Sequence, residues 1–97
     1  MKTYYDDYVH HCMRFFARNP QPTFQSEVDR LNWTACQDAL GRLVPTEQEI
    51  LLSVYREKDT LADNIFRVSK RLCVSQDKIW MMVKQNARAV AKRRKLI

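Results

Sequence analysis

The chain has 97 residues, of which 45% are hydrophobic and 29% charged, a balance that suits one folded domain rather than a disordered segment. One glycine and three prolines leave little material for β-hairpins or for glycine-rich phosphate-binding loops. The formal net charge is +6, and no window approaches the roughly 18 unbroken apolar residues that a membrane span requires. We therefore expect a single all-α domain over residues 1–97 and no membrane partner.

The first predicted helix covers residues 3–18. Apolar residues recur there at the i, i+4, i+7 and i+11 spacing that buries one face of a helix. Pro20 and Pro22 end it, because proline removes a backbone donor and disfavours helix in the residue before it. The expected buried stripe consists of Tyr5, Val9, Cys12 and Phe16, widened by Tyr8 and Phe15.

The second predicted helix covers residues 24–43. A break near Asn32 stays open, since Thr34 and Gln37 have the spacing of a capping box that would start a new helix. The candidate core positions are Val28, Leu31, Cys36, Ala39, Leu40 and Leu43.

Two more helices are predicted from capping signals. Thr46 and Glu49 have the three-residue spacing of a capping box, and Thr60 and Asp63 offer a second cap. The residues expected to point inward are Ile50, Leu51, Val54 and Tyr55 in the first helix, and Ile65, Val68 and Leu72 in the second.

The last predicted helix begins after Ser75, whose hydroxyl can accept hydrogen bonds from the free backbone donors of the first turn. A short turn at residues 73–75 joins it to the preceding helix, which is the arrangement of a helix-turn-helix. The predicted architecture is thus about five helices, with N-terminal helices in residues 1–43 and a helix-turn-helix part in residues 44–97. The inner stripe of the last helix is expected to be Ile79, Met82, Val83, Asn86 and Val90.

Charge is distributed unevenly along the chain. Residues 67–97 carry a net charge of +9, whereas residues 1–66 carry a net charge of −3. This asymmetry indicates that one end meets a polyanion, most often nucleic acid. For the basic run at residues 92–95 alone, a solubilising tail is an equal alternative, and RNA binding through this run is a third functional interpretation.

A set of residues in the second half of the chain follows a known pattern. These residues are Leu43, Pro45, Glu47, Glu49, Ile50, Leu51, Tyr55, Leu72, Cys73, Val74, Ser75, Ile79, Arg88 and Val90. With this pattern, the second half of the chain resembles region 4 of bacterial sigma factors and the small sigma-like proteins of phages and mobile elements, although Cys73 stands where the family prefers glycine. The resemblance implies a transcription regulator whose last helix reads a promoter element of the minus-35 type in double-stranded DNA. It also implies contact with the β-subunit flap of RNA polymerase.

The same resemblance implies which side chains meet DNA. Gln76 is expected at an adenine or a phosphate, Asp77 at a cytosine amino group, and Lys78 with Lys84 at phosphates. For Trp80 and Met81, contact with thymine methyl groups, packing within the protein and contact with a partner all stay open. The implied DNA-binding residues are Ser75, Gln76, Asp77, Lys78, Trp80, Met81, Lys84, Gln85 and Arg88.

A second class of function stays open beside DNA binding. The chain is alternatively a protein-interaction module that docks RNA polymerase core or a partner sigma subunit without sequence-specific DNA binding. The aromatic N-terminal helix offers a surface for such docking or for a homodimer.

Neither catalysis nor a cofactor is predicted. The sequence has no Gly-Lys-Ser/Thr loop, Cys-x-x-Cys pair or Ser-His-Asp constellation. His10, His11 and Cys12 are neighbours, but consecutive helical residues point to different sides, so structural roles are favoured over metal binding. Cys36 and Cys73, like Cys12, fit small buried hydrophobic residues in a reducing compartment. Because no signal peptide is evident, we expect a cytoplasmic protein.

Overall fold

The computed structural model describes residues 3–97 and contains five helices and no strand in that range. The predicted all-α fold class is confirmed. The helices are α1 (Asp6–Arg18), α2 (Glu27–Gly41), α3 (Pro45–Arg56), α4 (Leu61–Leu72) and α5 (Gln76–Arg93).

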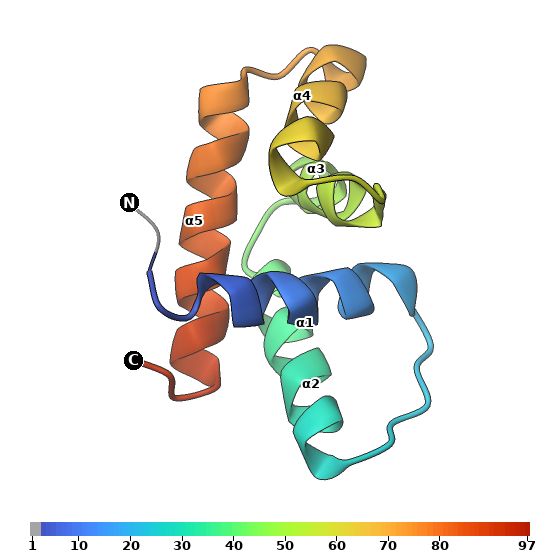
Figure 1. Ribbon diagram of the computed structural model, residues 1–97, viewed down its shortest axis with the longest axis vertical. Helices are drawn as coiled ribbons and strands as arrows, with labels where there is room; N and C mark the ends of the chain where they lie inside the picture. The colour runs from blue at the N-terminus through green and yellow to red at the C-terminus, as the bar shows by residue number, and fades with distance from the viewer. Residues whose placement is uncertain (1–2) are drawn as a thin grey trace.

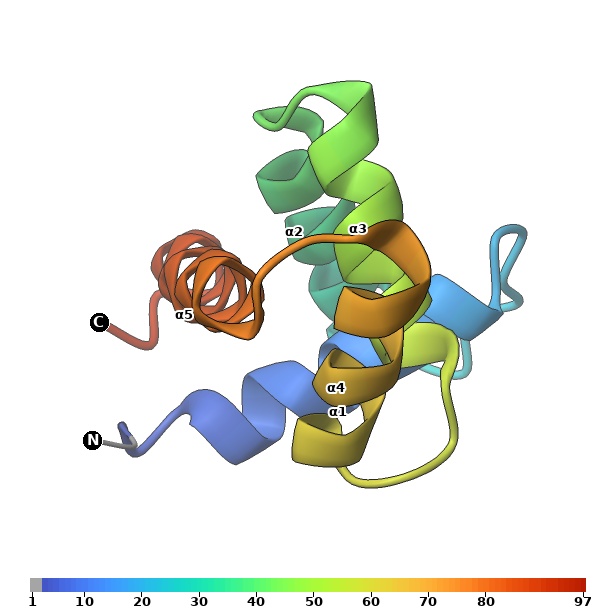
Figure 2. The same cartoon turned by 90° about the horizontal axis from the view of Figure 1, so that it is seen from above.

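Helix α5 is the longest element, and each of the other four helices packs against it. In Figure 1, α5 stands upright, α4 joins it at the top, and α1 passes it at a steep angle lower down. Seen from above in Figure 2, no other helix lies over the left side of α5.

Within residues 3–97, no helix has the length and apolar character needed to cross a membrane.

Helix α1 buries the stripe that its apolar spacing predicts, with two differences. Tyr5, Val9 and Cys12 are buried, but Phe16 is only half-buried. Met13 and Ala17, one residue further along the same face, are the buried residues of the later turns. Tyr8 and Phe15 are exposed, so the predicted widening of the stripe is wrong.

Helix α2 is continuous, so the break considered near Asn32 does not occur. Ser26 caps it, because its hydroxyl accepts a hydrogen bond from the Asp29 backbone N–H at 3.2 Å. Instead of ending a helix, Asn32 forms hydrogen bonds at the surface of α2. Its side-chain amide donates to the Tyr8 hydroxyl and accepts from Arg94. Of the predicted core positions, Cys36, Ala39 and Leu40 are buried, Leu43 is half-buried, and Val28 and Leu31 are exposed.

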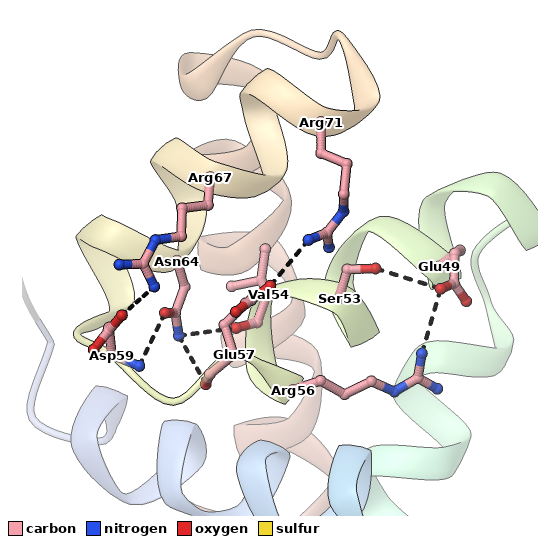
Figure 3. Close-up of polar contacts among 9 residues, drawn as sticks. All are labelled: Glu49, Ser53, Val54, Arg56, Glu57, Asp59, Asn64, Arg67 and Arg71. Carbon is pink, nitrogen blue, oxygen red and sulfur yellow. Dashed lines mark hydrogen bonds and ion pairs between the residues drawn. The ribbon is translucent and has the colours of Figure 1, made fainter.

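Helix α3 begins earlier than predicted, and the expected capping box at Thr46 and Glu49 is absent. The N-cap residue is Val44, without a side-chain cap, and Pro45 occupies the first turn, where its missing N–H is harmless. The Glu49 carboxylate instead accepts hydrogen bonds from the Ser53 hydroxyl and the Arg56 guanidinium, each at 3.3 Å (Figure 3). The four residues predicted to point inward, Ile50, Leu51, Val54 and Tyr55, are buried.

The joint between α3 and α4 is held by one buried amide. Asn64 donates to the backbone carbonyls of Val54 at 3.0 Å and Glu57 at 3.1 Å, and it accepts from the Asp59 backbone N–H at 3.2 Å (Figure 3). These bonds satisfy carbonyls at the end of α3 that would otherwise lack partners.

Helix α4 has the cap that the sequence predicts, because the Thr60 hydroxyl accepts from the Asp63 backbone N–H at 3.2 Å. Ile65 and Val68 are buried as expected. Leu72 is exposed rather than inward, since it is the last helical residue before the turn.

One polar side chain lies in the core without a hydrogen-bond partner among the described residues. Asn86 of α5 is 0% exposed, and neither its Nδ2 nor its Oδ1 is bonded within residues 3–97. We expect Asn86→Leu, which keeps the branched shape, to raise the free energy of unfolding by about 1–3 kcal/mol, because a buried unbonded amide carries its full desolvation cost. Urea denaturation followed by circular dichroism measures this change. Lower stability in Asn86→Leu would contradict it.

The three thiols should differ in reactivity. Burial raises the pKa of Cys12 to about 11 and that of Cys36 to about 12, so almost no thiolate forms there near pH 8. Cys73 is exposed, contrary to the prediction that all three cysteines are buried. We expect a thiol reagent at pH 8 to modify Cys73 rapidly in the native protein, and Cys12 and Cys36 only after denaturation. Rapid native modification of all three would contradict their burial.

Candidate nucleic-acid interface

The turn between α4 and α5 is built from three residues, as the sequence predicts. Cys73 adopts a left-handed conformation with φ 56° and ψ 44°, which reverses the chain after α4. The backbone N–H groups of Cys73 and Val74 both donate to the Ser69 carbonyl. The Ser75 hydroxyl then accepts from the Lys78 backbone N–H at 3.1 Å and caps α5. Local chemistry therefore stops one helix and starts the next within three residues.

Helix α5 has two contrasting faces. Its inner stripe is buried as predicted, and Ala87 and Ala91 are buried with it. The opposite side is exposed from the first turn onward, so Gln76, Asp77 and Lys78 are not covered by the N-terminal helices. We define the outer face of α5 as the exposed residues Asp77, Lys78, Met81, Lys84, Gln85 and Arg88.

Trp80 and Met81 take different positions. Trp80 is half-buried and packs against the core at the edge of the outer face. Met81 is 59% exposed at the centre of that face. Both side chains, together with Asp77, Lys84 and Gln85, line a shallow hollow on the surface of α5. Packing within the protein thus explains the buried part of the Trp80 side chain, whereas the Met81 side chain is accessible to a binding partner.

The cations of α4 and α5 have different surroundings. On α4, Arg67 pairs with Asp59, and Arg71 pairs with Glu57 at 3.0 Å (Figure 3). The ion pairs among residues 3–97 all use arginines outside α5. The positive charges of α5 therefore face solvent without a neutralising carboxylate from these pairs.

The C-terminal basic run is partly tied to the fold. Arg94 donates to the Asn32 side chain at 2.6 Å, and the Leu96 carbonyl accepts from the Tyr4 hydroxyl. Lys92 and Arg93 remain exposed at the end of α5. Only part of this run is therefore free to meet a ligand.

The neighbouring His10, His11 and Cys12 lie in three environments. His10 is half-buried, and its Nδ1 makes a hydrogen bond with the buried Tyr55 hydroxyl at 3.0 Å. His11 is exposed and Cys12 is buried. The three side chains do not converge on one point, as their helical spacing predicts.

The nine sequence-predicted DNA-binding residues lie along α5, from its N-cap Ser75 to Arg88. Eight are exposed and Trp80 is half-buried. The sequence did not indicate that α1 would lie beside them, because contacts between distant helices have no local signal.

Comparison of the chain with family models, with curated proteins and with solved structures finds no match.

Cys73 offers a direct test of the turn. A residue with a Cβ atom in the left-handed region is strained by roughly 1–2 kcal/mol, and glycine avoids this strain at some cost in unfolded-state entropy. We expect Cys73→Gly to raise the free energy of unfolding by about 0.5–1 kcal/mol, and the matched control Cys73→Ala to give no such gain. Chemical denaturation of the three proteins checks this, and equal stability of the glycine and alanine variants would refute the strain.

Proposed function

We propose that the protein is a DNA-binding transcription regulator that inserts the N-terminal end of α5 into the major groove of a promoter element. The role parallels that of region 4 of bacterial sigma factors, which the second half of the sequence resembles. Such a protein works where the DNA is, in the bacterial cytoplasm.

The observation that carries this proposal is the uncovered first turn of α5 behind a three-residue turn. Ser75 caps the helix, and Gln76, Asp77 and Lys78 are exposed ahead of it. A helix with its side chains is about 10–12 Å across, which matches a major groove about 12 Å wide. A recognition helix of this kind uses first-turn side chains to contact base edges, while the preceding helix lies against the backbone.

The charge on α5 supports the same proposal. Lys78, Lys84 and Arg88 lie on the outer face and take part in none of the ion pairs among the described residues. Phosphate contacts by such cations give affinity, and base contacts by Gln76 and Asp77 give sequence preference.

Selection of bound duplexes from a random pool, with and without purified RNA polymerase core, tests the proposed function. Enrichment of a common motif by the protein alone or with polymerase supports promoter recognition. Absence of enrichment in both arms rejects it.

A second candidate function has its own observation. Tyr8 and Phe15 are exposed on α1, and Tyr4, which precedes this helix, is 79% exposed. Exposed aromatic residues of this kind are common at protein interfaces. The alternative is therefore a module that docks RNA polymerase, a partner sigma subunit or a second copy through α1. It predicts polymerase capture or dimers without selection of any DNA motif.

Substitutions in α5 should separate phosphate contacts from base contacts. We expect Lys78→Ala and Lys84→Ala to weaken binding to all duplexes alike and to reduce the slope of log K against log salt by about 0.9 each. Gln76→Ala should instead change the sequence preference. Fluorescence anisotropy at several salt concentrations measures both effects.

Lys58→Ala is the matched control for these lysine variants, because Lys58 is an exposed lysine in the loop between α3 and α4. An equal loss of affinity in Lys58→Ala would show that net charge alone, and not the outer face of α5, governs binding.

A further inference from the structure

Met81 is the apolar member of the outer face of α5, and the other five residues of this face are charged or polar. Its side chain is 59% exposed. Asp77 and Gln85 lie four residues before and after it, and side chains at this spacing are neighbours on a helix surface, with Cβ atoms about 5–6 Å apart. An apolar group therefore occupies the middle of a row whose ends are a carboxylate and an amide.

Two cations flank this row. Lys78 and Lys84 lie three residues before and after Met81, a spacing that also makes side chains neighbours. Neither lysine takes part in the ion pairs among the described residues. A partner that covers Met81 therefore meets positive charge on both sides of it, and charge complementarity favours a partner that is anionic there. The same partner must offer apolar surface, because an apolar side chain stabilises a complex by leaving water.

The major groove of DNA offers both properties. Phosphates run along its edges, and thymine is the base of DNA that presents an apolar group in the groove, the methyl group at C5. Met81 follows Gln76, the first residue of α5, by five residues, which is about 7.5 Å along the helix. A groove about 8.5 Å deep therefore accommodates α5 as far as Met81 when the N-terminal end of the helix is inserted.

Trp80 is less suited to this contact than Met81. It packs against the core and also lines a cavity of about 420 Å³ between α1, α4 and α5, to which Asp6 of α1 and Leu61 of α4 contribute. The Trp80 side chain is therefore shared between the core, this cavity and the shallow hollow on α5. Met81 lines the hollow and not the cavity, so its exposed surface lies on the outer face.

We propose that Met81 is a specificity-determining residue that packs against the C5 methyl group of a thymine in the major groove. The inference rests on the proposed DNA-binding function and names one base that the outer face of α5 selects. The contact favours an A·T pair over a G·C pair at one position of the DNA site, because neither guanine nor cytosine carries a methyl group there. The flanking lysines contact phosphates and do not distinguish sequences.

Deoxyuridine provides the test, because it pairs with adenine as thymidine does and lacks only the C5 methyl group. The probe is the duplex that the wild-type protein enriches most strongly from a random pool, remade with deoxyuridine in place of each thymidine in turn. Fluorescence anisotropy gives the affinity for every duplex. We expect one of these replacements to weaken wild-type binding about threefold to fivefold, the effect of losing one buried apolar carbon from the contact.

Three variants assign the effect to Met81. Met81→Ala should lose the discrimination between thymidine and deoxyuridine at that position, and Met81→Leu, which keeps an apolar side chain of similar size, should retain it. Val28→Ala is the matched control, because it shortens an exposed apolar residue of α2, and it should discriminate as the wild type does. Each comparison is a ratio of two affinities measured with one protein, so a change in overall affinity does not affect it. Circular dichroism checks that every variant is folded.

The outcomes separate this inference from the function on which it rests. Discrimination that is lost in Met81→Ala and kept in Val28→Ala supports the methyl contact. Equal affinity of the wild type for the thymidine and deoxyuridine duplexes at every position overturns the contact and leaves DNA binding intact. Discrimination that Met81→Ala retains, or that Val28→Ala also loses, overturns it as well. Failure of the wild type to enrich any duplex overturns the proposed function and this inference with it.

Discussion

The burial of one face of α5 is the constraint on which the rest of the structure depends. Each of the other four helices packs against this helix, so the buried residues of α5 form the part of the core that all of them share. Because one side of α5 is buried, only its opposite side is exposed to solvent. The direction in which Lys84, Gln85 and Arg88 point is therefore set by the buried apolar residues between them.

Two short connections orient the helices around that core. Cys73 and Ser75 turn the chain from α4 into α5, and the hydrogen bonds of Asn64 hold the connection between α3 and α4. The connection between α3 and α4 also carries ion pairs, because Asp59 and Glu57 there pair with Arg67 and Arg71. As a result, the positive charge of residues 67–97 that has no ion-pair partner among the described residues lies mainly on α5 and on the residues that follow it, and α4 contributes less of this charge than the sequence suggests.

The sequence predicted most of the fold because its signals were local. Caps at Thr60 and Ser75 and the apolar period of α5 depend on residues within a few positions of one another. The capping box at Thr46 was wrong because Pro45 is already suited to the first helical turn. Val28 looked like a core residue but is exposed, since no other helix covers that part of α2. The outer face of α5 could be predicted from periodicity, whereas the cavity that Asp6 and Trp80 both line depends on tertiary packing.

The central position of α5 also determines how the molecule fluctuates. Local opening releases segments with few buried contacts, such as residues 19–26, which join α1 to α2. The amide protons on the inner side of α5 have no comparable route, because exposing them separates all four other helices from α5. We expect hydrogen exchange there to follow the global folding equilibrium. A ligand on α5 consequently acts on the cooperative stability of the whole domain.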